Sequence, residues 1–234
     1  LFGTRYGSIN TQFRLNGEAD YAEVPNGIAH FLEHKMFELP GGRDVSAEFA
    51  AMGAMTNAFT SYDLTAYYFS CTDNFYENLD ILLKSVSSVH CTDESVDKEK
   101  KIIAREITMY EDIPISTVTR NLYKALYSEH PTVMPVSGTI ESIEGITKET
   151  LFRAFNDFYV PENLSLCVCG NADPEKVKKA VERYFKDKTG KRPETLFPTE
   201  PKTVAKARNV DHSSVASALY CIGIKCAPDS TDTL

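Results

Sequence analysis

Two histidines enclose a glutamate within residues 30–34, which read H-F-L-E-H. On an α-helix of 3.6 residues per turn, positions 30, 33 and 34 fall on one face. Two imidazoles on that face can hold one Zn²⁺ ion, and the carboxylate between them can reach a water molecule on the metal. The order H-x-x-E-H is typical of inverted zinc hydrolases. The motif therefore predicts His30 and His34 as zinc ligands and Glu33 as the general base on the metal-bound water.

The alternative is an ordinary helix with two surface histidines and a solvated glutamate. The chain has only 5 histidines among its 234 residues, so chance should produce this pattern in about one such chain in a few hundred. Ile28, Phe31, Leu32 and Phe37 surround the motif, so at least one histidine must lie near buried apolar surface. A core histidine bound to a backbone carbonyl would explain one histidine, but two that flank a glutamate favour a metal site.

A second helix offers a carboxylate to the same site. Residues 93–111 carry an apolar repeat with the helical period, and Glu99 and Glu106 lie two turns apart on its apolar stripe. A carboxylate that faces a core is costly unless it is paired or binds a metal. We therefore predict Glu106 as the third zinc ligand, and Glu99 as a residue that hydrogen-bonds a ligating histidine and fixes its tautomer. Alternatively, both glutamates pair with Lys or Arg across a helix interface.

These motifs resemble the signature of the pitrilysin/insulinase metallopeptidases, in which H-x-x-E-H is followed far downstream by E-x6-E. Here Glu106 comes 72 positions after His34, and Glu99 precedes Glu106 by seven. Further landmarks stand in the family's order, namely G-I-A at 27–29, N-A-F-T at 57–60, H-P at 130–131 with Gly138, Y-V-P-E-N-L at 159–164 and G-N-A-D at 170–173. The resemblance covers residues 3–187 and is closest to bacterial members of the family.

The resemblance implies a zinc-dependent endopeptidase that hydrolyses peptide bonds in unstructured peptides. Such a zinc metalloendopeptidase would hold one Zn²⁺ ion. It also implies that Asn57, Ala58 and Phe59 belong to an edge strand onto which an extended peptide adds through backbone hydrogen bonds. From spacing alone, an ordinary strand that leads to a polar turn is an equally good interpretation. The predicted catalytic set is then Glu33 and Glu99.

Strands that are paired locally, with helices grouped between them, indicate an α+β fold with a largely antiparallel sheet. The resemblance implies the same fold, with the helices packed on one face of the sheet. Strands are predicted at 54–59, 64–71 and 164–169. Helices are predicted at 45–52, 93–111, 116–128, 147–159 and 174–187. One more, which Asp73 can cap, is predicted from an apolar stripe formed by Phe75, Leu79, Leu82, Val86 and Val89.

Three parts are predicted along the chain. They are a zinc-bearing peptidase domain at 1–187, a linker at 188–203, and the truncated start of a second, similar domain at 204–234, where residues 204–226 read as strands. One glycine and three prolines mark the linker, at Gly190, Pro193, Pro198 and Pro201.

The resemblance implies that family members close two halves around the peptide. An Arg and a Tyr of the second half, which help to hold the substrate carbonyl, have no counterpart in these residues. A second domain of the same chain or a partner subunit is therefore expected to close the active-site chamber.

Composition narrows the functional classes. A net charge of −8 with interspersed charges argues against a nucleic-acid partner. The sequence contains no stretch of about 18 apolar residues, so it predicts no membrane span. The six cysteines lack the short paired spacing of a disulfide framework, and reduced cysteines favour a cytoplasmic location. The sequence starts at Leu1 in strand-like residues without a signal-peptide pattern, which we interpret as a trimmed N-terminus.

Two other functions stay open. The chain can be a non-catalytic peptide-binding or scaffold subunit of the same family, or a fragment that is inactive because half of the chamber is absent. Relatives that lost activity also lost the motif, so the intact motif favours the enzyme. A purely structural zinc would need a fourth protein ligand, and only His90 and His130 remain in the first domain, neither at suggestive spacing.

Overall fold

A four-stranded sheet forms the centre of the computed structural model, which describes residues 1–212 and 215–226. Every pair of neighbouring strands is antiparallel, in the order β6–β7–β1–β8, and β1, from the start of the chain, lies between β7 and β8. The strands are β6 (Ala54–Thr60), β7 (Thr65–Cys71), β1 (Phe2–Thr4) and β8 (Leu164–Leu166). The antiparallel sheet expected from the sequence is confirmed.

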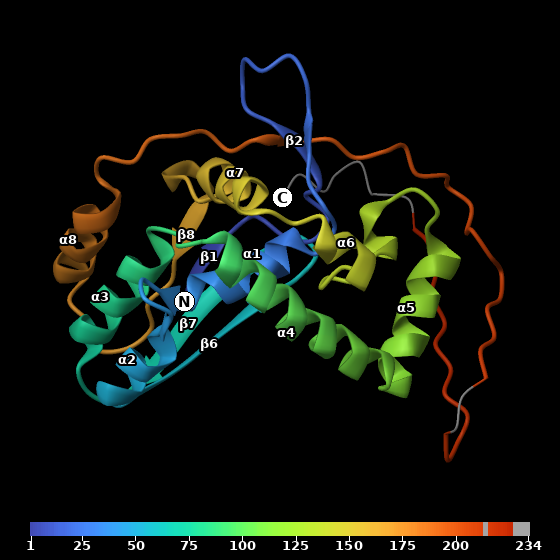
Figure 1. Cartoon of the computed structure of the whole chain (residues 1–234), viewed down its shortest axis with the longest axis horizontal. Helices are drawn as coiled ribbons and strands as arrows, with labels where there is room; N and C mark the ends of the chain where they lie inside the picture. Colours follow the sequence, from blue (N-terminus) through green and yellow to red (C-terminus); the bar gives the residue numbers. More distant parts are fainter. Residues whose placement is uncertain (213–214, 227–234) are drawn as a thin grey trace.

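Helices cover one face of this sheet and leave the other exposed. Along β6 the side chains alternate, so that Met55, Asn57 and Phe59 are exposed while Thr56 and Ala58 turn inward. The inner face is covered by α1 (Ile28–Met36), α2 (Val45–Ala51) and α3 (Phe75–Val86), as Figure 1 shows. Among the described residues β6 is an edge strand, because only β7 pairs with it.

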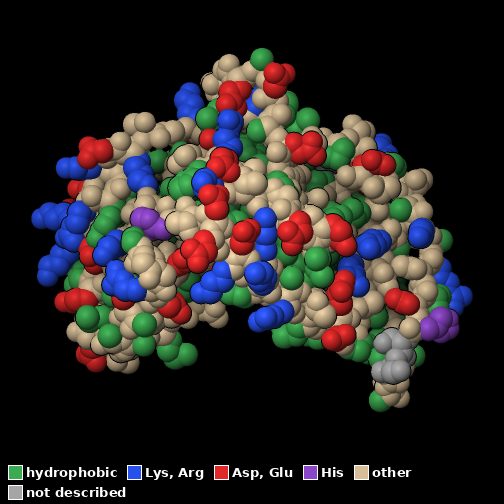
Figure 2. Space-filling view, viewed as in Figure 1, with side chains coloured by type: hydrophobic (Ala, Val, Ile, Leu, Met, Phe, Trp, Pro, Cys, Tyr) green, Lys and Arg blue, Asp and Glu red, His purple; other side chains and the backbone are tan. Residues whose placement is uncertain are grey.

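The helix α4 (Asp93–Glu111) has the bounds that its periodicity predicts. Thr92 and Ser95 form a capping box at its start. Its own residues Val96, Ile103 and Ile107 are buried on the side that faces the core. Figure 1 shows α4 crossing in front of α1, and Figure 2 shows acidic and basic side chains interspersed on the outer surface in this region. The crossing brings the inward-facing residues of α4 against α1.

The remaining helices complete the shell around the core. They are α5 (Pro114–Leu126), α6 (Ile140–Glu144), α7 (Lys148–Phe158) and α8 (Pro174–Phe185), with short 3₁₀ turns η1 (Pro131–Val133) and η2 (Pro161–Asn163). Proline stands at the first position of α5 and of α8, where a missing N–H costs no hydrogen bond. The fully buried rings of Tyr6 and Phe158 stack at 4.0 Å under α7.

Three details of the predicted elements are wrong. The helix α3 ends at Val86, before Val89 of its predicted apolar stripe. Asn74, not Asp73, stands at the N-cap of α3, with a φ of 54° in the left-handed region that asparagine tolerates. The strand predicted at 164–169 ends at Leu166, because its partner β1 spans only three residues.

Short strands form two further sheets outside the central one. The sheet β3–β2–β9 joins Ala22–Glu23, Gln12–Arg14 and Glu194–Thr195, and the hairpin β4–β5 joins Glu38–Leu39 and Arg43–Asp44. The strand β9 belongs to the segment predicted as a linker. The linker is therefore hydrogen-bonded to the first domain along part of its length.

The C-terminal segment contains no strand in the parts of 204–226 that the structure describes, so the strands predicted there are wrong. A strand needs a neighbouring strand to satisfy its backbone, and this segment instead runs along the outside of α5 (Figure 1), where Lys206 N donates to Ala125 O at 2.9 Å. Tyr220 and Ile222 are each 85% exposed. The domain boundaries at 187 and 203 stay a prediction.

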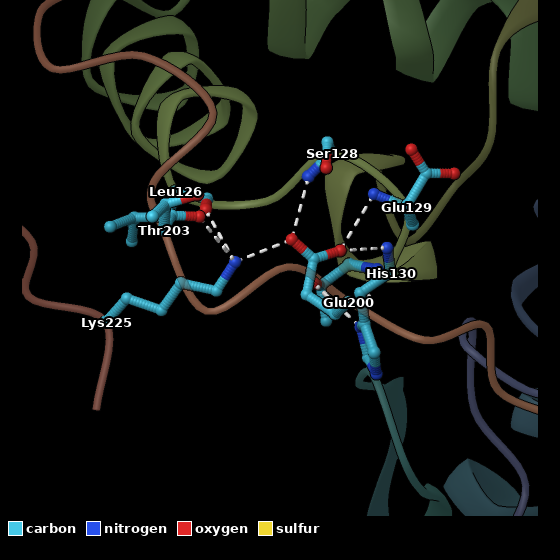
Figure 3. Close-up of polar contacts among 8 residues, drawn as sticks. Leu126, Ser128, Glu129, His130, Glu200, Thr203 and Lys225 are labelled. Carbon is cyan, nitrogen blue, oxygen red and sulfur yellow. Dashed lines mark hydrogen bonds and ion pairs between the residues drawn. The ribbon is translucent and has the colours of Figure 1, made fainter. Parts of the chain in front are cut away.

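The carboxylate of Glu200 anchors this segment to the loop after α5, as Figure 3 shows. It accepts backbone N–H groups from Ser128 (3.1 Å), Glu129 (2.8 Å) and His130 (2.7 Å), and the ammonium group of Lys225 at 2.6 Å. These donors hold the pKa of Glu200 at about 2, although desolvation alone would raise it. We call Glu200, Lys225 and the three amides the Glu200 anchor.

No helix in the described ranges is both long and apolar enough to cross a membrane.

Candidate metal centre

The helix α1 presents both histidines on one face, as its spacing predicts. Phe31 and Leu32 on its inner side are fully buried, whereas the imidazoles of His30 and His34 are only 12% and 25% exposed at the surface of a cavity. The two ring centroids lie 4.7 Å apart. The helix begins after Gly27, whose φ of 90° is accessible mainly to glycine.

The helix α4 brings Glu106 against both rings. His30 Nε2 lies 3.6 Å from Glu106 Oε1, and His34 Nε2 lies 3.4 Å from Glu106 Oε2. One ligand atom from each of the three residues lies within 4.8 Å of the other two. Two imidazoles and one carboxylate are the donor set of many catalytic zinc sites, which keep a fourth position open. The structure thus brings the three predicted ligands together.

Glu99 contacts the ring of His34 from the side away from Glu106. Its Oε1 lies 2.9 Å from His34 Nδ1, so a proton on Nδ1 leaves the lone pair of Nε2 facing the metal position. This is the contact predicted for Glu99. The described ion pairs of Glu99 and Glu106 are with histidines and include no Lys or Arg, so the alternative pairing across a helix interface is not found.

The electrostatics of the cluster fit a bound cation. Burial lowers the pKa of His30, which favours the neutral ring. Burial opposes protonation of His34 too, but the carboxylates of Glu106 and Glu99 outweigh it and raise the pKa of His34 to about 9. The nearby His34 lowers the pKa of Glu106. Two imidazoles and a carboxylate converge here, and a zinc ion fits this donor set by displacing the proton that His34 holds in its absence.

His30 Nδ1 is buried and has no hydrogen-bond partner among the described residues. A buried, unpaired ring nitrogen is costly. Metal coordination through Nε2 would make Nδ1 an N–H donor, and this donor has no acceptor comparable to the one that Glu99 provides for His34.

Glu33 lies between the two histidines and lines the same cavity. Burial raises the pKa of its carboxyl, and a hydrogen bond from the Thr60 hydroxyl (2.6 Å, to Oε2) opposes that shift. A half-desolvated carboxylate with a raised pKa beside a metal position is chemically suited to accept a proton at neutral pH.

A cavity of about 590 Å³ extends from these side chains between β6 and α5. Ala58 and Phe59 line it, but Asn57 does not, and the Asn57 amide oxygen instead accepts the backbone N–H of Ala58 at 2.9 Å. The structure therefore brings two of the three predicted substrate-binding residues to the cavity. Their role in binding a peptide stays a prediction.

Sequence reasoning missed the far walls of the cavity. Tyr62 after β6, Arg120 and Tyr123 on α5, and the loop at 132–139 all line it. The ring centroids of Tyr62 and Tyr123 lie 5.3 Å apart with the rings tilted at 55°, and desolvation raises the pKa of Tyr62 to about 12. The spacing of these residues along the sequence does not predict that they line a common cavity. Two of the lining residues carried a signal through the family resemblance, namely Thr60, which ends the N-A-F-T motif, and Gly138.

The predicted alternative of a structural zinc finds no fourth ligand. Among the described residues, His30, His34 and Glu106 form the only group of three or more His, Cys, Asp or Glu placed to hold one metal ion. His130 instead stacks on Phe197 at 5.5 Å beside the Glu200 anchor, and His90 lies at an exposed position after α3.

Family models, curated proteins and solved structures relate this chain to known peptidases. A family model described as "Insulinase (Peptidase family M16)" matches residues 18–140, and one described as "Peptidase M16 inactive domain" matches residues 145–233. The zinc protease YmfH of Bacillus subtilis, itself uncharacterized, is 43% identical over 198 residues, which cover 85% of this chain and 45% of YmfH. YmxG of the same organism, also an uncharacterized zinc protease, is 32% identical over 89% of this chain and 52% of YmxG.

The crystal structure of an M16-like peptidase from Alicyclobacillus acidocaldarius superposes with a TM-score of 0.81 at 45% identity, over 88% of this chain and 49% of that chain. The chain thus spans about half the length of the curated relatives it matches.

Proposed function

This chain belongs to the insulinase family of peptidases, peptidase family M16, and from that premise we propose that it is the metal-bearing half of a zinc-dependent endopeptidase. One observation carries the proposal. His30, His34 and Glu106 converge within 4.8 Å, with Glu33 beside them in one cavity. A purely structural role for this helix pair gives no reason for two imidazoles and a carboxylate to converge at a cavity surface.

Zinc is the metal that the donor set and the zinc-protease relatives favour. Held by His30, His34 and Glu106, it would polarise a peptide carbonyl and acidify a water molecule. Glu99 keeps the ring of His34 in one orientation and one tautomer through the 2.9 Å contact with Nδ1.

Glu33 moves the proton in this proposal. Its carboxylate takes a proton from the attacking water and returns it to the nitrogen of the departing amine, which would otherwise leave as an unstable anion. The partial burial that raises the pKa of Glu33 brings it closer to neutral pH, where such transfer is most efficient.

The substrate class follows from the edge strand. In the described structure β6 has a free edge beside the cavity, and an extended peptide can add there through backbone hydrogen bonds while a side chain enters the cavity beside Phe59. Binding through the backbone requires the substrate to be extended. We therefore propose unstructured peptides rather than folded proteins as substrates.

A second half is needed to close the cavity over the peptide. The chain spans about half of its relatives, and the model of an M16 inactive domain already begins to match at residue 145. We propose a second domain of the same chain, or a partner subunit, as that half. The inactive-domain match also favours a second candidate function, peptide binding without hydrolysis by this half alone.

Mass-spectrometric analysis of a mixture of unstructured peptides tests the proposal. The chain with added zinc should cleave peptides, whereas the Glu33→Gln variant and a chelator-treated sample should not. The conservative Glu94→Gln change, on the exposed start of α4, is the matched control and should cleave normally. Cleavage by Glu33→Gln at the normal rate would contradict the assignment. Peptide binding without cleavage by the wild type would favour the second candidate.

A further inference from the structure

The Glu33 carboxylate has one side-chain partner among the described residues, the hydroxyl of Thr60. Thr60 Oγ1 donates to Glu33 Oε2 at 2.6 Å, in a partly buried setting. A threonine hydroxyl has a single proton, so this proton is committed to Glu33. Hydrogen bonds from a hydroxyl to a carboxylate are short and strong compared with neutral pairs.

Thr60 is itself held rigidly. It is the last residue of β6 and lies opposite Thr65 in a ladder of seven paired residues between β6 and β7. Thr65 is fully buried, its hydroxyl donates to the backbone oxygen of Tyr6 at 2.8 Å, and its Oγ1 lies 3.3 Å from Thr60 Oγ1. Because a β-branched side chain has few χ1 rotamers, the Thr60 hydroxyl is fixed relative to the sheet.

A carboxylate that turns freely about its last torsion has no preferred oxygen, since this torsion is broad in glutamate. The bond from Thr60 removes that freedom by occupying Oε2. We propose that Thr60 is a positioning residue for Glu33, which fixes the carboxylate plane and leaves Oε1 as the oxygen that accepts the proton of the attacking water. This inference rests on the proposed function of Glu33 as general base.

A plain structural role is the alternative, because threonine is common in strands for its shape alone. Thr56 offers a matched comparison. It lies four residues earlier on the same strand and the same face, and its hydroxyl donates to the backbone oxygen of Tyr68 at 3.0 Å. Thr56 is not among the residues that line the cavity. Valine keeps the shape of threonine and removes only the hydroxyl, whereas serine keeps the hydroxyl.

Kinetics provide the first readout. Thr60→Val should lower kcat by about 10- to 100-fold, the loss typical of a misplaced catalytic group, with KM and zinc affinity unchanged. Thr60→Ser should restore kcat to within about threefold of the wild type, because the donor is retained. Thr56→Val should behave as the wild type. In a Glu33→Gln background, Thr60→Val should cause no further loss, since its effect acts through Glu33.

Infrared difference spectroscopy provides a readout that does not depend on turnover. With ¹³C-labelled glutamate at pH 8, removal of the Thr60 hydroxyl should shift one carboxylate stretching band. This band should be absent from the same comparison in the Glu33→Gln background, and Thr56→Val should produce no shift.

A Thr60→Val variant with wild-type kcat, a Thr60→Ser variant as slow as Thr60→Val, or an unshifted carboxylate band would each overturn the proposal. Wild-type protein that binds zinc but cleaves no peptide would contradict hydrolysis by this half alone, and the infrared comparison would then still decide whether Thr60 holds Glu33.

Discussion

The metal centre and the Glu200 anchor are both built around carboxylates that bring distant parts of the chain together, yet they differ in how those carboxylates are satisfied. Glu200 receives three backbone N–H groups and one ammonium group, so its charge is neutralised by donors of the chain itself. Glu106 faces two imidazoles at 3.4 and 3.6 Å, and among the described residues no backbone N–H, Lys or Arg is paired with its carboxylate. A carboxylate with enough donors ties a segment down, whereas lone pairs that converge with too few protons form a site for a cation.

Replacement of Glu33 should give the largest difference in kcat between a change at the metal centre and a change at the Glu200 anchor. Glu33→Gln removes the proton acceptor and keeps the shape of the side chain, so we expect kcat to fall by about 100- to 10 000-fold while zinc affinity stays unchanged. Stopped-time peptide cleavage with calorimetric zinc binding measures both quantities. A fall in kcat in Glu200→Gln, at the anchor, as large as that in Glu33→Gln would contradict the distinction between the two regions.

Glu99 tests whether the outer contact of the metal centre matters. Glu99→Gln weakens the hold on His34 Nδ1, so zinc affinity should fall by about 10- to 100-fold. Competition with a fluorescent zinc chelator measures the change. Glu94→Gln on the same helix is the control and should bind zinc as the wild type does. Equal affinities in both variants would place Glu99 outside the metal site.

Acidity should weaken the metal centre over a defined range. The pKa of metal-free His34 is raised from 6.5 to about 9, so this ring carries a proton at neutral pH that zinc must displace. Apparent zinc affinity should therefore rise about tenfold per pH unit from pH 7 and level off near pH 9. In Glu99→Gln the plateau should begin at a lower pH. An affinity independent of pH between 7 and 9 would contradict the protonated state of His34.

The Glu200 anchor should show the smallest and purely structural effect. Glu200→Gln removes the charge that Lys225 and the amides neutralise, and a partly exposed contact of this kind should lower Tm by about 2–4 °C without a change in zinc affinity. The folded-state pKa of Glu200 is depressed from 4.5 to about 2, so its stabilisation is complete above pH 4.5 and is lost as the pH falls through 2. Thermal scans of both proteins from pH 2 to pH 7 test this.

A lower zinc affinity in Glu200→Gln would show that the Glu200 anchor and the metal centre are not independent. Thr203 provides a check, because its backbone oxygen accepts from Lys225 while its side chain is outside the anchor. Thr203→Ala should leave both Tm and zinc affinity close to those of the wild type.

The sequence predicted which side chains of α1 and α4 meet, and the reason is physical. All four residues of the motif lie on two helices with strong periodicity, so helical geometry alone fixes which side chains share a face. The bounds of α4 and the contact between Glu99 and His34 followed from the same periodicity.

Other parts of the structure could not be predicted from the sequence because they depend on contacts between segments that are far apart along the chain. The anchor joins Glu200 to amides some 70 positions earlier and to Lys225 25 positions later, and no local pattern encodes such distances. The strands predicted at 204–226 were wrong because alternating apolar residues signal a strand only where a neighbouring strand is present. Tyr123 lines the cavity because α5 packs there, and the sequence does not specify that orientation.

Calorimetric zinc titration of the wild type beside Glu106→Gln and Glu200→Gln tests the central claim most directly. If converging lone pairs define the metal centre, the wild type and Glu200→Gln will each bind one zinc ion per chain with the same affinity, and Glu106→Gln will bind it far more weakly. Saturable binding that survives Glu106→Gln unchanged, or no zinc binding by the folded wild type, would contradict the account.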